Sequence, residues 1–256
     1  VLRGQYRGVS FASFKLAKDR AVGERVSLIE HEGHSGVDPG RQESCHPHWV
    51  GVSPDNQYVI VPDLGADKVF IHKLDAKTGK LTRHGAAAAV PGGGPRHFKF
   101  DPSGQFGYLL NELTVSLSVY RWNASAGELA LIQTIPALTE QQKAGQDHNS
   151  GSEVRVHPSG KFVYSANRGH DSISAFKVDR SSGKLSLVEV EPIRGSWPRN
   201  FNLDPSGRWL LAAGRDSNTL SVFSIDQETG ALRYALKSAS VPAPICVVVA
   251  KPVPSP

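Results

Sequence analysis

The residues whose types and spacing could do chemistry stand in one short stretch, GPRHFKFDPSGQFGYLLNEL. Arg96 opens an alternating segment, Pro95–Phe100, and Glu112 closely follows an apolar segment, Phe106–Leu110. The turn between the two segments, Asp101–Gly104, carries the Pro and the Gly that tight turns favour. Antiparallel pairing of such a hairpin would bring Arg96 and Glu112 to the same edge of a sheet.

A carboxylate beside a guanidinium can support both proton transfer and anion binding. Glu112 could take a proton from water, as general bases do. Arg96 could bind a phosphate or a carboxylate through two hydrogen bonds, or stabilise an oxyanion. The alternative is a structural salt bridge at a strand end, because such ion pairs also occur without a function.

The turn in this stretch recurs along the chain, at intervals of about 50 residues. Related turns stand at Ser53–Asn56, Asp101–Gly104, His157–Gly160 and Asp204–Gly207. A second turn with a Gly follows each of them, in Lys77–Leu81, Ser125–Leu129, Ser181–Leu185 and Glu228–Leu232. Two strand-like segments lie between the two turns, such as Phe162–Ala166 and Ser172–Val178, so each repeat holds four short strands.

A period of this length with four strands per unit is typical of a β-propeller blade. A β-sandwich is the weaker interpretation, since its strands have no reason to repeat the same two turns in phase. We therefore predict an all-β chain that forms a single β-propeller domain over residues 1–256. Its full repeats span roughly 46–93, 94–149, 150–195 and 196–243.

The two ends of the chain resemble parts of further blades. Val9–Leu16, followed by Asp19–Gly23 and Arg25–Glu30, matches the third and fourth strands of a repeat. Pro244–Lys251 matches an innermost strand. The sequence contains no Met, and we expect the chain to be incomplete at its N-terminus. The two end pieces could pair to close a ring, or whole blades could precede the first residue; the sequence leaves both open.

Composition limits the class of function. The 25 Gly and 17 Pro suit a turn-rich β protein. No apolar run approaches a membrane span and no signal-peptide pattern opens the chain, so no membrane partner is expected. The net charge of +5 slightly favours small anionic ligands, and no Lys/Arg cluster predicts nucleic-acid binding. Cys45 and Cys246 make no disulfide framework, which predicts a reduced, cytoplasmic setting.

Four runs carry a resemblance to a known family: HPHWVGVSPDNQYVIVPDLGADKV, GPRHFKFDPSGQFGYLLNEL, GSEVRVHPSGKFVYSANRGHDSISAF and WPRNFNLDPSGRWLLAAGRDSNTLSVF. Together they resemble the lactonase family of seven-bladed β-propellers, which includes propeller-type 6-phosphogluconolactonase and the fungal carboxy-cis,cis-muconate lactonizing enzyme. The resemblance covers residues 1–251 and rests on the motifs occurring together, since DPSG turns recur in many propellers. Seven blades in the family imply that about two are absent at the N-terminal end.

The resemblance also implies an active site at the mouth of the central channel. In the cycloisomerase branch, one His, two Arg and one Glu line that mouth. By motif they fall on His48, Arg96, Glu112 and Arg168. Arg199 of WPRN is a rival for the position of Arg168. Glu153 of GSEV holds the place that Arg96 and Arg199 hold relative to their own turns, so we predict Glu153 and Arg199 as substrate-binding residues.

The histidines allow more than one interpretation. His46 and His48 alternate in a predicted strand, and His48 could be an acid or a base because imidazole titrates near neutrality. A metal site of His46, His48, His97 and His157 is the alternative. The sequence has no strong metal motif, so we predict no metal and no cofactor. His97 and His157 adjoin turns and are expected to form local hydrogen bonds.

The longer loop Gln141–Ser152 contains Asp147 and His148. It could cover the channel mouth and add these two side chains to the site. An ordinary solvated insertion is the interpretation that we favour.

Three functions remain, from different classes. The first is a lactone hydrolase on 6-phosphogluconolactone or a similar sugar lactone, opened by water attack. The second is a muconate-type cycloisomerase, and the third is a propeller that binds partners without catalysis. One imidazole, one carboxylate and two guanidiniums at one mouth favour an enzyme. We predict the hydrolase, a monomer acting on a small anionic lactone.

Overall fold

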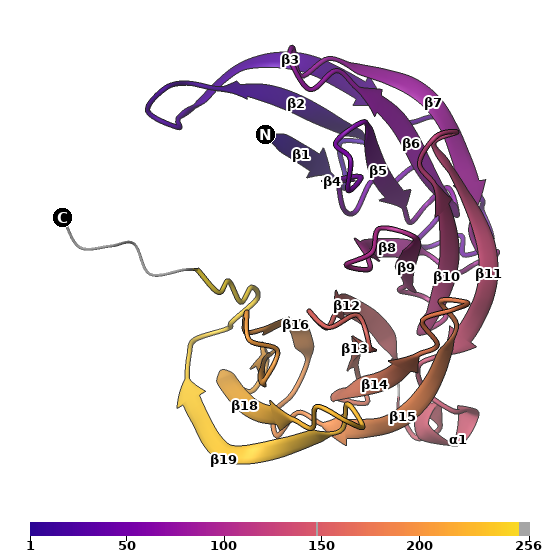
Figure 1. Ribbon diagram of the computed structural model, residues 1–256. Coiled ribbons are helices and arrows are strands. Elements are labelled where there is room, and N and C mark those ends of the chain that lie inside the picture. The colour runs from indigo at the N-terminus through magenta and orange to yellow at the C-terminus, as the bar shows by residue number, and fades with distance from the viewer. Residues whose placement is uncertain (147, 251–256) are drawn as a thin grey trace. The chain divides into compact units, whose positions relative to one another are not determined.

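The computed structural model describes residues 1–146 and 148–250. The chain divides into two compact units, Val1–Pro136 and Ala137–Pro256. Both are built from antiparallel sheets whose strands follow one another in chain order (Figure 1). Within the described ranges, the structure contains no helix long and apolar enough to cross a membrane.

The first unit holds three sheets. The first sheet is three-stranded and consists of β1 (Leu2–Gln5), β2 (Ser10–Leu16) and β3 (Val22–Glu30). The second sheet consists of β4 (Gly51–Val52), β5 (Tyr58–Asp63), β6 (Lys68–Leu74) and β7 (Leu81–Ala88). The third sheet consists of β8 (Pro95–Phe100), β9 (Phe106–Asn111), β10 (Ser116–Asn123) and β11 (Glu128–Pro136).

The second unit begins with one short helix and holds two sheets. The helix is α1 (Glu140–Lys143), which Thr139 and Gln142 close with a capping box. The fourth sheet consists of β12 (Ser150–Val156), β13 (Phe162–Arg168), β14 (Ser172–Val178) and β15 (Leu185–Pro192). The fifth sheet consists of β16 (Pro198–Leu203), β17 (Trp209–Gly214), β18 (Thr219–Ile225) and β19 (Leu232–Ser240).

The four-stranded sheets confirm the blade repeats that the sequence predicts. Two expectations at the ends of the chain need correction. The first sheet contains one strand more than expected, because Leu2–Gln5 pairs with β2. The predicted innermost strand over Pro244–Lys251 does not form in residues 244–250, and Lys251 lies outside the described residues. Val247 instead bonds to side chains, with its N–H donating to Asn200 Oδ1.

In the third and fifth sheets, the repeated turn forms because the side chain of an aspartate accepts hydrogen bonds from the backbone N–H groups that follow it. Asp101 Oδ1 accepts a hydrogen bond from the N–H of Phe106 at 2.9 Å, and Oδ2 accepts one from Ser103 at 3.1 Å. Gly104 closes the turn with a φ of 72°, a conformation that costs glycine little. Asp204 makes the same two bonds in the fifth sheet. The turn thus fixes the register of the first two strands.

Two buried asparagines hold the far ends of these hairpins. Asn111, at the end of β9, is fully buried, and its amide donates to the hydroxyls of Ser116 and Ser118 at 3.0 and 2.9 Å. In the fourth sheet, Asn167 does the same toward Ser172 and Ser174 on β14. These bonds tie the second strand to the third at the point where Glu112 and Arg168 follow.

The core lies between successive sheets of one unit. Phe98, Leu109 and Tyr120 of the third sheet pack with Ile60 and Val69 of the second. Each large side chain that is fully buried contributes about 1.5–3 kcal/mol to folding. In the second unit an equivalent cluster forms around aromatic residues, among them Phe162, Tyr164, Phe201 and Phe223.

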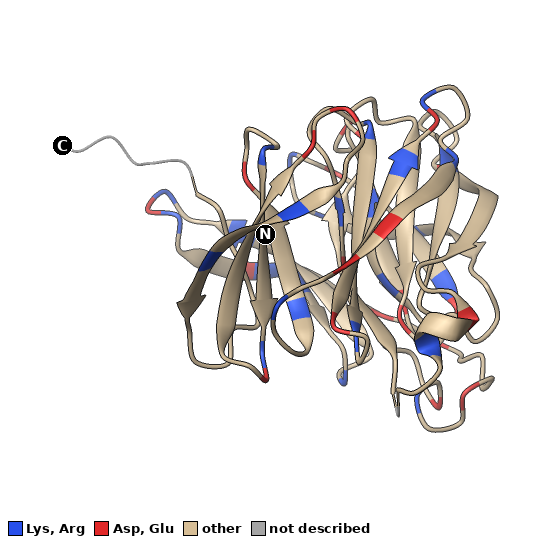
Figure 2. Cartoon of the chain, turned by 90° about the horizontal axis from the view of Figure 1, so that it is seen from below, with Lys and Arg blue, Asp and Glu red and all other residues tan. Residues whose placement is uncertain are grey.

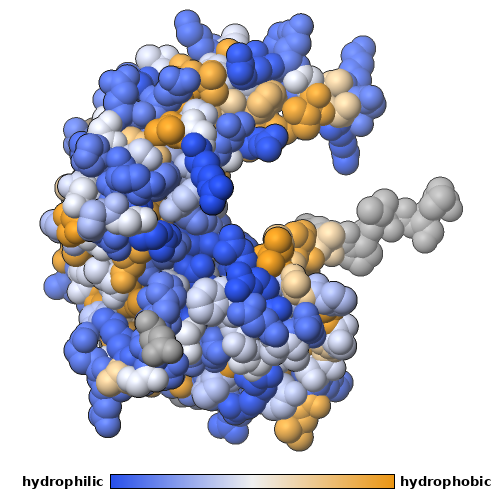
Figure 3. All heavy atoms as spheres, turned by 180° about the vertical axis from the view of Figure 1, so that it is seen from behind, coloured by the Kyte–Doolittle hydropathy of each residue, from blue (hydrophilic) through white to orange (hydrophobic). Residues whose placement is uncertain are grey.

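Charges are mixed along the strands and turns. In the view of Figure 2, basic and acidic residues are interspersed rather than gathered in one block. Figure 3 shows hydrophilic residues over most of the face in view, with hydrophobic residues next to the grey terminal trace. Near the end of the described chain, Ile245 and Val248 are 56% and 79% exposed.

His72, on β6, is a titratable side chain at a buried position. It is 1% exposed. Burial, the neighbouring His31 and Arg83 lower the pKa of His72 to about 3. The ring is therefore neutral in the folded chain, whereas an unfolded histidine is protonated below pH about 6.5.

We predict that His72→Phe makes the chain more resistant to acid. As pH falls below 6.5, the unfolded wild-type chain gains a proton that the folded chain does not take. Protonation of unfolded His72 therefore lowers the unfolding free energy by up to about 1.4 kcal/mol for each pH unit below 6.5. The loss continues until the pH reaches the pKa of His72 in the folded chain, about 3. Urea unfolding at pH 7.5 and pH 4.5 measures the difference, with exposed His34→Gln as the control. Parallel losses in wild type and His72→Phe would contradict the prediction.

We also predict that Asn111→Ala lowers the unfolding free energy by about 2 kcal/mol, because two buried hydrogen bonds are lost and their partners are left in the core. Urea unfolding measures this change. The matched control is Gln105→Ala, at an exposed turn position, which should differ from wild type by less than about 0.5 kcal/mol.

Candidate active site

A bulge near the start of several first strands turns one side chain out of the regular alternation. In the third sheet the extra residue is Arg96, and in the fifth sheet it is Arg199. In the fourth sheet the extra residues are Ser152 and Glu153. Bulges re-aim side chains and are enriched near functional sites. The equivalence of Arg96, Arg199 and Glu153 that the sequence predicts thus has a structural basis.

His48 holds the corresponding place in the second sheet. The preceding Pro47 bridges to Asp63 at the end of β5, as Pro95 pairs with Asn111. The strand expected through His46 and His48 is absent, however, because β4 is confined to Gly51–Val52. His48 is held instead by its backbone N–H, which donates to Pro62 at 3.1 Å.

Glu112 is the centre of a charged cluster in the first unit. Its Oε2 accepts a hydrogen bond from Arg96 Nε at 2.7 Å, and its Oε1 accepts one from Arg41 Nη2 at 2.7 Å. His48 Nε2 lies 3.8 Å from Oε2 of the same carboxylate. The predicted proximity of Arg96 and Glu112 is confirmed. The catalytic roles of these residues stay predictions.

The members of the cluster differ in their access to solvent. The side chains of Arg96 and Glu112 are 3% and 4% exposed, whereas those of His48 and Arg41 are 17% and 35% exposed. A buried ion pair is costly to break, since either partner left alone is an uncompensated charge. Arg96 and Glu112 therefore form a buried ion pair, and Arg41 and His48 are the more exposed members of the cluster.

Sequence reasoning missed Arg41 and Tyr6. Arg41 lies in the segment between β3 and β4, where no repeat motif exists to reveal it. The neighbouring Gln42 is fully buried and anchors this segment, because its amide donates to Leu64 O at 2.8 Å and to Asp67 Oδ1 at 2.7 Å. The location of Arg41 thus depends on long-range contacts that no local pattern indicates.

Tyr6 joins the histidines of the cluster. Its ring stacks on His46 with the ring centres 4.4 Å apart, and it meets His48 edge-on at 5.2 Å. The ring centre of His97 is 5.4 Å from that of His48, and its Nε2 is 3.1 Å from Arg96 Nη1. The imidazole of His48 therefore contacts two other rings, those of Tyr6 and His97.

The electrostatics of the cluster correct one expectation. Burial, together with the positive charge of Arg96 and the proximity of His97, lowers the pKa of His48 well below its ordinary value. The sequence suggested that His48 titrates near neutrality. In the structure its lowered pKa leaves it neutral at that pH. For Arg41, burial opposes the charge, yet the contacts with Glu112 and Tyr6 raise its pKa above the ordinary value. Arg41 is a permanent cation.

The remaining candidates belong to the second unit. Arg168 is 6% exposed, and its Nη2 donates to Gly151 O at 2.7 Å while its guanidinium lies 5.6 Å from the ring centre of Trp197. Glu153 is 2% exposed and accepts from Asn200 Nδ2 at 2.5 Å. Arg199 is half-buried. Their participation in one site with His48, Arg96 and Glu112 stays a prediction.

The other histidines named from the sequence have local roles. His157 bonds within its own turn to Ser159 Oγ at 2.7 Å, as expected, and also bonds to Gly207 O in the turn of the fifth sheet at 2.8 Å. His148 bonds to Ser150 Oγ, and Asp147 lies outside the described residues. In the described part of the chain, no three His, Cys, Asp or Glu side chains are grouped so that they could hold a metal ion.

Comparison with known proteins gives the chain a family. The model of the family described as Lactonase, 7-bladed beta-propeller matches residues 1–249. The 6-phosphogluconolactonase of Bacillus subtilis (strain 168) is 38% identical over 247 residues, which are 96% of this chain and 69% of the relative. That of Formosa agariphila is 38% identical over 66% of this chain, which spans 48% of the relative's length.

Solved structures agree with the sequence comparison. A Bacteroides fragilis protein superposes with a TM-score of 0.87 at 32% identity, over 96% of this chain and 68% of its own. The periplasmic gluconolactonase PpgL of Pseudomonas aeruginosa gives 0.84 at 33% identity, over 92% of this chain and 64% of its own. With these matches and the blade-like sheets described above, the chain belongs to the lactonase family of seven-bladed β-propellers.

Proposed function

We propose that this chain carries a lactone-hydrolase site and opens a sugar lactone of the 6-phosphogluconolactone type. The observation that carries the proposal is the cluster around Glu112, which combines two guanidiniums with a neutral imidazole. The two relatives named as 6-phosphogluconolactonases support the choice of substrate class. The chain spans only part of these relatives, so activity of the whole protein is included in the proposal.

Hydrolysis of a lactone needs a proton acceptor for water and positive groups where the oxyanion develops. His48 can be the acceptor because it is neutral, and its lowered pKa makes it a weaker base than a free imidazole. Glu112, 3.8 Å from Nε2 of the same ring, would stabilise the imidazolium that forms. Arg96 would stabilise the oxyanion.

Arg41 is suited to bind the anionic group of the substrate. Its side chain is 35% exposed, more than those of His48 and Arg96. A guanidinium has five N–H donors, so its hydrogen bonds to Glu112 and Tyr6 leave donors for a phosphate. In the second unit, Arg168 and the predicted substrate-binding residues Glu153 and Arg199 are the further candidates.

The alternatives from the sequence are less well supported. A muconate-type cycloisomerase would use the same anion-binding groups, but no observation favours it over the hydrolase. A binding propeller without catalysis has no need of a buried carboxylate between two guanidiniums. The monomeric state and the cytoplasmic setting stay predictions, and one similar protein is named as periplasmic.

We predict that Glu112→Gln lowers kcat for 6-phosphogluconolactone by at least about tenfold, which corresponds to roughly 1.4 kcal/mol of barrier. The neutral amide can neither stabilise an imidazolium nor accept a proton. Acid release in a pH-stat, corrected for spontaneous hydrolysis, measures the rate. Exposed Glu128→Gln is the matched control. If the folded Glu112→Gln chain were as active as this control, Glu112 would have no part in the reaction.

We predict that Arg41→Gln raises KM for 6-phosphogluconolactone by about tenfold, since a charged hydrogen bond contributes about 1.5–3 kcal/mol. For the unphosphorylated gluconolactone, KM should rise much less. The ratio of the two KM values is the readout, because any disturbance of Glu112 affects both substrates equally. An unchanged ratio would show that Arg41 does not recognise the phosphate.

A further inference from the structure

Tyr6 holds a place in the first sheet that corresponds to the place of Glu112 in the third. Tyr6 directly follows β1, and Glu112 directly follows β9. The two hairpins have the same register at this point: Gln5 pairs with Ser10, and Asn111 pairs with Ser116. The side chains that follow these two strands meet in one cluster, because Arg41 contacts both Tyr6 and Glu112.

The ring of Tyr6 is held by the two histidines of the HPH run. It stacks on the imidazole of His46 with 4.4 Å between the ring centres and an angle of 10° between the planes. Nδ1 of His46 also lies 3.1 Å from the backbone O of Tyr6. The ring of His48 meets that of Tyr6 edge-on at 5.2 Å. The phenol hydroxyl is therefore confined to the neighbourhood of the cluster.

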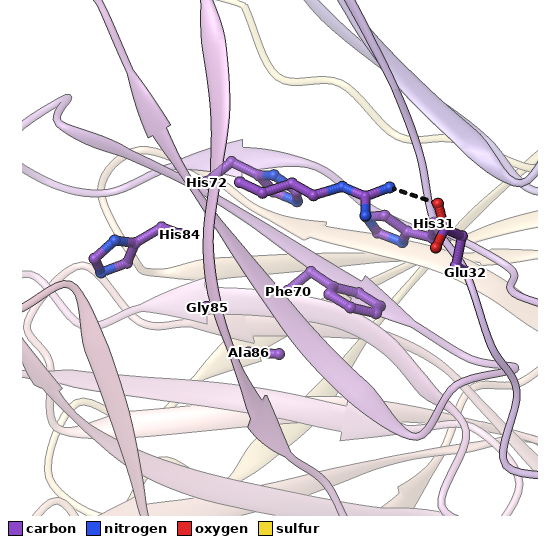
Figure 4. A pocket seen from close by; sticks show the side chains of 8 residues that line it. His31, Glu32, Phe70, His72, His84, Gly85 and Ala86 are labelled. Carbon is purple, nitrogen blue, oxygen red and sulfur yellow. Dashed lines mark hydrogen bonds and ion pairs between the residues drawn. The ribbon is translucent and has the colours of Figure 1, made fainter.

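Buried groups position His46 in turn. Its backbone N–H donates to Asp63 Oδ1 at 2.6 Å, and Oδ2 of Asp63 lies 2.7 Å from Nδ1 of His31. Figure 4 shows His31 close to Phe70, beside a cavity of about 350 Å³ that lies against β6 and β7. The ring centres of His31 and Phe70 are 4.0 Å apart. The location of Tyr6 thus depends on fixed groups inside the first unit.

The hydroxyl of Tyr6 is suited to donate its proton. Arg41 forms a hydrogen bond with Tyr6. A guanidinium can only donate, so the phenol oxygen accepts this bond and its own O–H is left to point elsewhere. The side chain of Tyr6 is half-buried, so a substrate bound at Arg41 can meet the hydroxyl.

The second half of lactone hydrolysis needs such a donor. When the tetrahedral intermediate collapses, the ring oxygen leaves as an alkoxide, a strong base that a general acid stabilises by protonation. Arg41 and Arg96 keep their protons, and His48 is neutral before the reaction. Tyr6 brings to the cluster a neutral O–H group.

We propose that Tyr6 is the general acid that protonates the ring oxygen of the lactone as the ester bond breaks. This role rests on the proposed hydrolase function. The bond between the carbonyl carbon and the ring oxygen breaks, its electron pair stays on the oxygen, and the phenol proton moves to that oxygen. Arg41 stabilises the phenolate, which then regains a proton from water. One proton is released overall, from the new carboxylic acid.

The proposed substrate fits this division of roles. In 6-phosphogluconolactone the ring oxygen and the phosphate are attached to neighbouring carbon atoms. Arg41, which binds the phosphate in the proposed function, contacts Tyr6. A phosphate bound to Arg41 would therefore bring the ring oxygen close to the phenol hydroxyl.

The test uses Tyr6→Phe, which keeps the stacked ring and removes the hydroxyl. The matched control is Tyr234→Phe, at a half-buried position on β19 of the second unit. The substrates are 6-phosphogluconolactone and the thiolactone in which sulfur replaces the ring oxygen, since a thiolate leaves without a proton. We expect kcat for the lactone to fall at least about hundredfold in Tyr6→Phe, and kcat for the thiolactone to fall less than about threefold. KM for the lactone should change less than about threefold.

The other outcomes separate this role from the proposed function. If Tyr6→Phe were as active on the lactone as Tyr234→Phe, the donor would be the imidazolium of His48, and the role of Tyr6 would be overturned. Equal losses on lactone and thiolactone would also overturn it, because the loss would then come from packing. A rise in KM with unchanged kcat would mean that Tyr6 only supports Arg41. A folded wild-type chain without activity on either substrate would contradict the hydrolase function itself, and the role of Tyr6 with it.

Discussion

The candidate site depends on a set of buried hydrogen bonds. They are made by the residues at the ends of the second strands. Asn111 and Asn167 each donate to two hydroxyls on the neighbouring third strand, and all of these groups are buried. Asp63, in the same place of the second sheet, accepts from the backbone N–H groups of His46, Gly65 and Ala66. These bonds fix the backbone at the end of each second strand. They therefore also fix the position of the residue that follows.

The cluster in the first unit behaves as one electrostatic unit. Glu112 compensates both Arg96 and Arg41, and either guanidinium alone would leave a charge in a poorly solvated place. Burial, the charge of Arg96 and the neighbouring His97 outweigh the carboxylate of Glu112 and keep His48 neutral. The pKa of His48 is thus set by the whole cluster and cannot be predicted from the residue type alone.

Much of the fold could be predicted from the sequence, because the turns are local. The DPSG motif contains all the groups that close its own turn, so Pro95–Phe100 was predicted with its observed bounds. The Arg96–Glu112 contact follows from the same hairpin. Arg41 and Tyr6 could not be predicted, since tertiary contacts of loops outside the repeat place them. The strand predicted at Pro244–Lys251 rests on an alternation like that of β16. It does not form over residues 244–250, where the backbone of Val247 bonds to the side chains of Asn200 and Asn202 on β16.

The bulged position at the start of the first strands has a consequence for evolution. Arg96 and Arg199 each follow a proline there, and Glu153 holds the matching place in the fourth sheet. A bulged residue contributes little to the ladder, so its side chain can change without loss of pairing. Duplication of a blade followed by a single codon change would therefore yield a new functional group at an existing location. Divergence of chemistry in such a chain needs few mutations and leaves the cores between the sheets unchanged.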